Sequence, residues 1–139
     1  MARDSFKPAA GIAVLRQIDD TWCVLCLKTH KGNLDLTKGI IDEGESAMET
    51  ALRETQEEAG ITEVTFPYGK EPVVSDACTM FVGVTSQDPE IKPNPHSGVM
   101  EHAGFIWLPL LEAINSTKIK NFLMPAVEYA YSLVYNDRS

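Results

Sequence analysis

Three glutamates could do chemistry together, since Glu57 and Glu58 follow Glu54 by three and four residues in a stretch with helical periodicity. Side chains at that spacing are neighbours on one side of a helix, so the three carboxylates would converge. Like charges placed this way destabilise a helix by roughly 0.2–0.5 kcal/mol per pair. A divalent cation would offset the repulsion, and carboxylate oxygens suit magnesium or manganese. The ordinary alternative is a solvated acidic face that binds no metal.

The helix that carries these glutamates is predicted to run from Ala47 to Ala59. Ser46 can cap its first turn by accepting a bond from a backbone N–H, and Glu49 can reach back to complete a capping box. Gly60 follows the last turn, where a residue that turns left-handed without a Cβ penalty is favoured. The predicted core face of the helix consists of Met48, Leu52, Thr55 and Ala59.

The stretch from Gly39 to Ile61, GIIDEGESAMETALRETQEEAGI, is similar to the Nudix box. That motif reads Gly, five residues, Glu, seven residues, Arg-Glu, an apolar residue, any residue, Glu-Glu, any residue, Gly and an apolar residue. Its charged and glycine positions are matched by Gly39, Glu45, Arg53, Glu54, Glu57, Glu58 and Gly60. Thr55 stands where the motif has an aliphatic residue, and its β-branched side chain can fill that volume. The chain therefore resembles the Nudix hydrolases.

The resemblance implies a role for each charged residue of the box. Glu57 and Glu58 look like direct ligands of a magnesium or manganese ion, and Glu54 looks like either a ligand or the general base. Arg53 would orient the glutamates of the helix. Glu45 would brace the preceding loop, through Arg53.

Residues 29–38 form a predicted polar loop that leads into the box and is locally basic. The cations in it and directly before it are Lys28, His30, Lys31 and Lys38. They either contact the phosphates of a substrate or belong to a solvated connection. In similar Nudix families the residue before the first box glycine lies beside the metal, and a backbone carbonyl there is often a ligand. Lys38 and Gly39 match that place.

A further glutamate, Glu101, precedes a predicted strand that contains Trp107. Nudix hydrolases commonly have a glutamate on this loop, opposite the box helix, and the pair Glu101-His102 resembles that of the asymmetric diadenosine tetraphosphate hydrolases. By this resemblance Glu101 is a metal ligand or a second candidate for the base. The alternative is an exposed acid of a loop.

The composition indicates one domain over residues 1–139, long enough to bury a core. The net charge of −8 argues against a nucleic-acid-binding surface, although it allows a small phosphorylated substrate if metal ions bridge the like charges. No apolar run approaches the ~20 residues of a membrane span, and MARDSFKPAAGIAVLR has no clear cleavage site. We therefore expect a cytoplasmic protein with no membrane segment, either a monomer or a homodimer.

Two of the three cysteines, Cys23 and Cys26, form a C-x-x-C pattern that invites a redox interpretation. The surrounding residues, TWCVLCLK, have the pattern of a buried strand instead. An offset of three in a strand places the two thiols on opposite faces, where they could neither share a metal nor form a disulfide. We expect both, and Cys78, to be reduced core residues.

The rest of the chain alternates between strands and turns. Strands are predicted over Lys7–Arg16, Trp22–Lys28, Glu63–Tyr68, Val73–Thr85 and Gly104–Leu108, with a short extended piece at Leu34–Leu36. Residues 17–21 form a turn with an Asp pair at its tip. Gly83 is interpreted as a bulge in the long central strand. Residues 86–99, which include three prolines, form a loop at the predicted substrate mouth.

Two further helices close the chain. A short one starts at Pro109, and the last lies within Asn121–Tyr135 and is regular from about Met124, because Pro125 is tolerated only in a first turn. Strands that flank one central and one C-terminal helix predict an α+β fold with a mixed β-sheet between helices. The Nudix resemblance implies the same α/β/α sandwich.

The predicted function is metal-dependent hydrolysis of a pyrophosphate bond in a nucleoside or dinucleoside polyphosphate. Chain length and the Glu-His pair resemble diadenosine tetraphosphate hydrolases, but Asp76, Ala77 and Cys78 stand where relatives of that group place a tyrosine. A (d)NTP pyrophosphohydrolase is therefore the alternative, and sugar nucleotides stay possible. Two other classes are a Nudix module that senses a nucleotide without cleaving it and an acidic interaction domain without metal. The first usually loses box glutamates, which are all present here.

Overall fold

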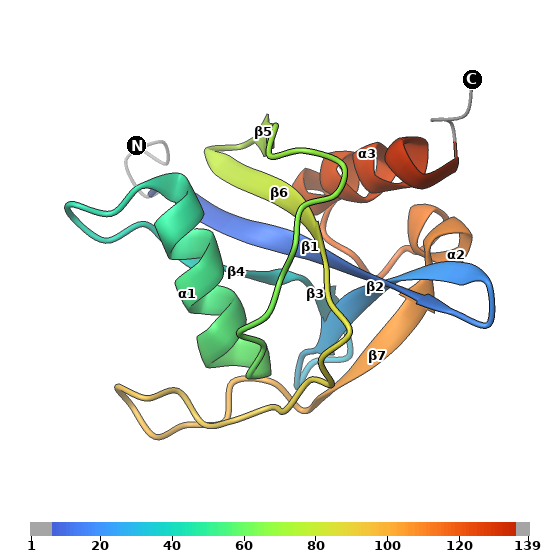
Figure 1. Cartoon of the computed structure of the whole chain (residues 1–139). Helices are drawn as coiled ribbons and strands as arrows, with labels where there is room; N and C mark the ends of the chain where they lie inside the picture. The colour runs from blue at the N-terminus through green and yellow to red at the C-terminus, as the bar shows by residue number, and fades with distance from the viewer. Residues whose placement is uncertain (1–6, 136–139) are drawn as a thin grey trace.

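The computed structural model describes residues 7–135, in which one mixed β-sheet lies between helices (Figure 1). Its strands are β1 (Ala9–Ile18), β2 (Thr21–Lys28), β3 (Leu34–Asp35), β4 (Thr37–Ile40), β5 (Val73–Ser75), β6 (Cys78–Val84) and β7 (Gly104–Pro109). Its helices are α1 (Ala47–Ala59), α2 (Leu110–Ile114) and α3 (Met124–Tyr135), with a 3₁₀ turn over Asn121–Leu123. The strand order is β3-β2-β1-β6-β5, with β4 also paired to β1 and β7 to β2. β1 and β6 are parallel, and the other pairs are antiparallel.

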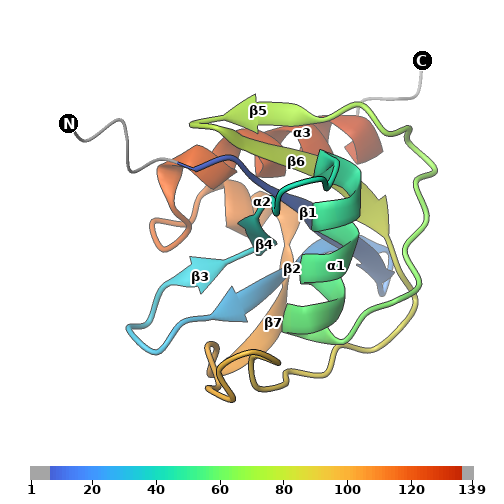
Figure 2. The ribbon, with the colours of Figure 1, turned by 90° about the vertical axis from the view of Figure 1, so that its left-hand side faces the viewer.

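The centre of the sheet is buried on both faces, with α1 on one face and α2 and α3 on the other (Figure 2). Alternate side chains of β1 serve the two layers: Ile12 and Val14 pack with α1, whereas Ala13 and Leu15 pack with the C-terminal helices. Burial on both faces explains why this strand is a continuous apolar run instead of an alternating one. The predicted α+β sandwich with a mixed sheet is confirmed.

Helix α1 begins and ends where the sequence predicts. Ser46 Oγ accepts a bond from the Glu49 N–H (3.1 Å), and Glu49 Oε1 accepts one from the Ser46 N–H (2.9 Å), which completes the capping box. Gly60 adopts a left-handed conformation with φ 68°. The predicted core face is wrong at Leu52, which is 40% exposed. The fully buried residues are Thr50, Ala51, Thr55 and Ala59, and these smaller side chains let the helix lie close to the sheet.

The predicted long strand over Val73–Thr85 is instead a hairpin of β5 and β6. Asp76 (φ 50°) and Ala77 (φ 64°) form its two-residue turn, in which both residues are left-handed. Such turns favour Asn-Gly or Asp-Gly pairs, because most side chains oppose a positive φ. An Asp-Ala turn within a β-branched and aromatic run therefore gave no sign of the break.

Three further predictions about the strands need correction. Glu63–Tyr68 contains only an isolated bridge, between Thr65 and Val84, and no continuous strand. Gly83 makes no bulge, because β1 and β6 stay in register past it. A Cβ at Gly83 would lie 2.5 Å from Val64 Cγ1. This glycine therefore permits the close approach of residues 64–66 to β6. The first strand begins two residues later than predicted and extends to Ile18.

The cysteine prediction is confirmed. Cys23, Cys26 and Cys78 are buried and form no disulfide. Cys26 lies in the cluster that faces α3, and burial raises the pKa of its thiol to about 12. A thiol that stays protonated at neutral pH is a poor nucleophile and a poor metal ligand.

The N-terminal residues 1–6, the start of the segment judged to lack a signal peptide, lie outside the described residues. Among residues 7–135, no helix has the length and apolar character needed to cross a membrane.

The β1–β2 turn offers a test of the sheet away from the carboxylates. Asp19 (φ 51°) and Asp20 (φ 65°) are both left-handed there, as predicted for a tight turn. We expect Asp20→Gly to raise the free energy of unfolding by about 0.5–1 kcal/mol, because glycine adopts this conformation without the Cβ penalty. Urea denaturation measures the change. Asp20→Val, which is β-branched, should lower the same quantity, and equal stability of both variants would contradict the turn.

Candidate active site

The approach of β4 to helix α1 brings the box residues together. A Cβ on Gly39 would overlap with the carboxyl group of Glu54, so a larger residue there would displace this carboxylate from its place beside the strand. One residue earlier, the backbone N–H of Lys38 donates to Glu58 Oε1 at 2.9 Å. Beneath them, the Thr55 hydroxyl is buried between Thr37 Oγ1 (3.0 Å) and the Ala51 carbonyl (2.8 Å). Strand and helix are thus joined directly at the carboxylates.

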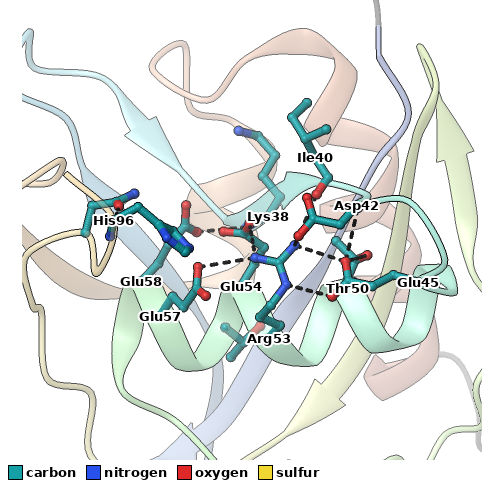
Figure 3. Close-up of polar contacts among 12 residues, drawn as sticks. Lys38, Ile40, Asp42, Glu45, Thr50, Arg53, Glu54, Glu57, Glu58 and His96 are labelled. Carbon is teal, nitrogen blue, oxygen red and sulfur yellow. Dashed lines mark hydrogen bonds and ion pairs between the residues drawn. The ribbon is translucent and has the colours of Figure 1, made fainter.

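The guanidinium of Arg53 links the loop before the helix to the glutamates on it (Figure 3). Its Nε donates to Glu45 Oε2 at 2.8 Å, the contact expected from the sequence. Its Nη1 lies 3.0 Å from Glu54 Oε2 and 3.3 Å from Glu57 Oε1. Bonds from Arg53 and from the Thr50 hydroxyl lower the pKa of Glu45 to about 2, so Glu45 stays ionised.

The negative charges of the carboxylates deeper in the site are less well compensated by cations and hydrogen-bond donors. Burial, with a smaller contribution from the nearby charge of Glu54, raises the pKa of Glu58 to about 9, although a hydrogen bond from the Lys38 N–H opposes the shift. Burial also raises the pKa of Glu54, only partly offset by Arg53. Partly buried carboxylates held this close without enough positive charge are a donor set that a divalent cation would neutralise.

A cavity of about 20 Å³ lies between the helix and the loop that precedes β7. Its acidic lining residues are Glu54, Glu57, Glu58 and Glu101. A space of roughly 10–15 Å³ suffices for one water molecule, so the cavity has the size of a single small ligand. Across residues 7–135, no group of three or more His, Cys, Asp or Glu side chains is already arranged to hold a metal ion. The donor types and the space fit a cation, whose binding would require these side chains to turn toward it.

A larger pocket of about 600 Å³ shares these residues. Of the predicted site residues, it is lined by Lys38, Gly39, Arg53, Glu54, Glu57, Glu58 and Glu101. Glu45 lies behind Arg53, and Gly60 caps the far end of the helix. Lys28 and His30 do not line this pocket: Lys28 is exposed, and His30 Nε2 is bonded to the Met100 carbonyl at 2.8 Å. The structure therefore gathers Gly39, Arg53, the three helix glutamates, Lys38 and Glu101 around this pocket, but not Lys28 and His30.

Several residues around the pocket were missed from the sequence. Asp35 holds the Lys38 ammonium at 3.1 Å and lies 3.7 Å from His102 Nε2. Burial raises the pKa of Asp35, but His102 and Lys38 together bring it below its ordinary value. The other missed residues line the pocket itself: Lys7, Asp76, Asn94, His96 and Phe122. The polar Asp35 between two leucines was the one available sign, since apolar neighbours of a buried carboxylate require a partner for it.

A known protein family has a model that matches most of this chain. The model of the NUDIX domain matches residues 5–128. The search of curated proteins gives no match.

Solved structures share the fold at low sequence identity. A Caenorhabditis elegans Ap4A hydrolase in a binary complex is 19% identical over 94% of this chain and 98% of its own, with a TM-score of 0.71. The NUDIX domain of Shewanella oneidensis NrtR complexed with ADP ribose is 17% identical over 93% and 89%, with a TM-score of 0.66. The Escherichia coli dihydroneopterin triphosphate pyrophosphohydrolase is 20% identical over 86% and 92%, with a TM-score of 0.58.

The family model spans most of the chain and includes the whole glutamate-bearing helix, the glycine before it and the loop that carries Glu101. The box motif, the sandwich fold and the family match agree with one another. This chain therefore belongs to the NUDIX domain family and is a pyrophosphohydrolase of the Nudix type.

Proposed function

We propose that this protein uses a magnesium or manganese ion to hydrolyse pyrophosphate bonds in nucleoside or dinucleoside polyphosphates. One observation carries the proposal: four carboxylates from two separate segments line a cavity of about 20 Å³ beside a pocket that is also lined by two lysines. The four are Glu54, Glu57, Glu58 and Glu101, and the lysines are Lys7 and Lys38.

Nudix hydrolases generally use divalent metal ions, and the raised pKa values of Glu54 and Glu58 support such an ion here. Glu57 and Glu58 would hold it, together with Glu54 or Glu101 and the backbone carbonyl of Gly39. When bound, a divalent ion would supply Lewis-acid chemistry, lowering the pKa of the attacking water and stabilising negative charge on the phosphates.

The side chains divide the remaining tasks. One carboxylate must accept the proton of the attacking water, and Glu54 and Glu101 are the candidates because the other two are assigned to the ion. Arg53 keeps Glu54 and Glu57 in place by sharing its guanidinium between them. Lys38, fixed by Asp35, presents a cation to the phosphates of the substrate.

For the substrate, a dinucleoside polyphosphate of the diadenosine tetraphosphate type is our first choice. One similar structure is an Ap4A hydrolase and another is a dihydroneopterin triphosphate pyrophosphohydrolase. A (d)NTP is the alternative substrate. In both substrate classes the hydrolysed bond is a pyrophosphate bond, and the same residues would act on it. A module that only senses a nucleotide is a weaker candidate, because every charged position of the box is retained.

A turnover screen tests this function. With magnesium and a panel of dinucleoside polyphosphates, nucleoside triphosphates, ADP-ribose and NADH, we expect cleavage of at least one nucleotide, with products separated by chromatography. Glu57→Gln should reduce kcat at least about 100-fold, since it removes a proposed ligand of the ion.

The matched control is Glu128→Gln, which removes an exposed glutamate of α3 outside the pocket. It should leave kcat unchanged. Binding of nucleotide without turnover of any member of the panel would favour the sensing module, and equal activity of both variants would contradict the metal site.

The buried carboxyl of Glu58 predicts the pH dependence of stability without metal. Because its pKa is raised from 4.5 to about 9, the stability it contributes is complete below pH 4.5 and is lost as the pH rises through about 9. The melting temperature should therefore fall across this range. Glu58→Gln should flatten the fall and raise the melting temperature at pH 8, by a few degrees if ionisation costs about 1 kcal/mol.

Magnesium should have the opposite effect on the wild type, because an ion binds the ionised carboxylate in competition with the proton. The rise in melting temperature on adding magnesium should be larger at pH 8 than at pH 6, and smaller in Glu58→Gln than in the wild type. Differential scanning calorimetry measures both quantities. If the melting temperature of Glu58→Gln fell with pH as steeply as that of the wild type, this carboxyl would not be the main cause of the pH dependence.

A further inference from the structure

The loop of residues 86–103 passes the C-terminal end of α1 and carries Glu101 (Figure 1). Asn94 organises the middle of this loop. Its Oδ1 accepts bonds from the backbone N–H groups of His96 (2.8 Å) and Ser97 (3.1 Å). Its own backbone is bonded to the Val99 carbonyl (2.8 Å) and to the Gly98 N–H (2.8 Å). These four bonds close a compact turn around one side chain.

The other end of the same amide contacts the acidic site. Asn94 Nδ2 donates to Glu101 Oε2 at 2.8 Å, and both residues line the cavity shared with Glu54, Glu57 and Glu58. The orientation of the amide is not free, because only its oxygen can accept from the two backbone N–H groups. The turn therefore aims the donor at Glu101 before any ligand is bound.

The backbone on both sides of Glu101 is anchored as well. His30 Nε2 is bonded to the Met100 carbonyl at 2.8 Å, and the Ala103 N–H donates to the Lys28 carbonyl at 2.7 Å. With the main chain fixed at 100 and 103, the remaining freedom of Glu101 lies in its own side-chain torsions. Glu101 is exposed, so few packing contacts restrict those torsions.

We propose that Asn94 is a positioning residue that holds the Glu101 carboxylate toward Glu54, Glu57 and Glu58. The inference rests on the proposed function, in which Glu101 serves as a ligand of the ion or as the base. An amide N–H occupies one oxygen of the carboxylate and leaves the other for the cation or the water. Fixing a flexible glutamate in advance lowers the entropy lost when the ion and the substrate bind.

Asn94→Ser separates the two roles of the side chain. A serine hydroxyl can still accept from the N–H groups of the turn but is too short to reach Glu101. We expect kcat to fall about tenfold with little change in KM, and the dissociation constant of Mn²⁺ to rise by a similar factor. Ser97→Ala is the matched control, since it removes a hydroxyl that accepts from the Val99 N–H (3.2 Å) in the same loop without touching Glu101. It should leave both quantities unchanged.

A double-mutant cycle with Glu101→Gln identifies the route of the effect. If Asn94 acts through Glu101, then Asn94→Ser should cause no further loss of kcat or Mn²⁺ affinity in the Glu101→Gln background. Asn94→Asp is a second probe: it retains the acceptor of the turn and replaces the donor by a charge that repels Glu101. It should lower kcat at least as much as serine does, with an unchanged circular dichroism spectrum.

Wild-type kcat and Mn²⁺ affinity in Asn94→Ser would overturn this role, and so would a full additional loss in the Glu101→Gln background. Either result would leave the proposed hydrolase intact, provided that Glu57→Gln still abolishes turnover. A wild-type protein that cleaves no nucleotide but binds Mn²⁺ would remove the proposed function, while the Mn²⁺ measurements would still decide the role of Asn94. Absence of Mn²⁺ binding by the wild type would overturn both.

Discussion

The close approach of β4 to α1 is the constraint on which the acidic site depends. Gly39 has no Cβ, and a Cβ there would displace the carboxyl group of Glu54 from its present position. The small buried residues Ala51 and Ala59 allow the helix to lie near the sheet at the same place. The strand then covers Glu58, which loses water and gains a single backbone N–H in exchange. Packing thus creates the desolvation that raises the pKa of these carboxyls.

The arrangement of several acidic side chains around one guanidinium lowers the stability of the metal-free protein. Arg53 contacts Glu45, Glu54, Glu57 and Asp42. One positive charge cannot compensate four negative ones, and Glu45 takes the shortest of these contacts. Such a conflict between local stability and arrangement is expected where a site is built for a ligand. The proposed cation supplies the charge that the fold lacks.

The parts that the sequence could predict are those decided by neighbours along the chain. Both ends of α1 follow from Ser46, Glu49 and Gly60, each of which acts within one turn. The exposed Leu52 could not be predicted, because the hydrophobic pattern gives a face but not how closely the sheet approaches it. The contact of Asn94 with Glu101 depends on a loop with no periodic pattern, so nothing in its spacing indicated it.

The basic residues before the box show why nearness in sequence does not place side chains in a pocket. Lys38 lies on β4 and lines the pocket, whereas His30 lies beyond β2 and binds the loop of Glu101 instead. Lys38 is itself paired with Asp35, and Arg53 is shared among carboxylates. Lys7 also lines the pocket, but the acidic side chains there outnumber the three cations. Since the pocket is acidic, the proposed cation would have to neutralise most of the phosphate charge, which makes substrate binding itself depend on the ion.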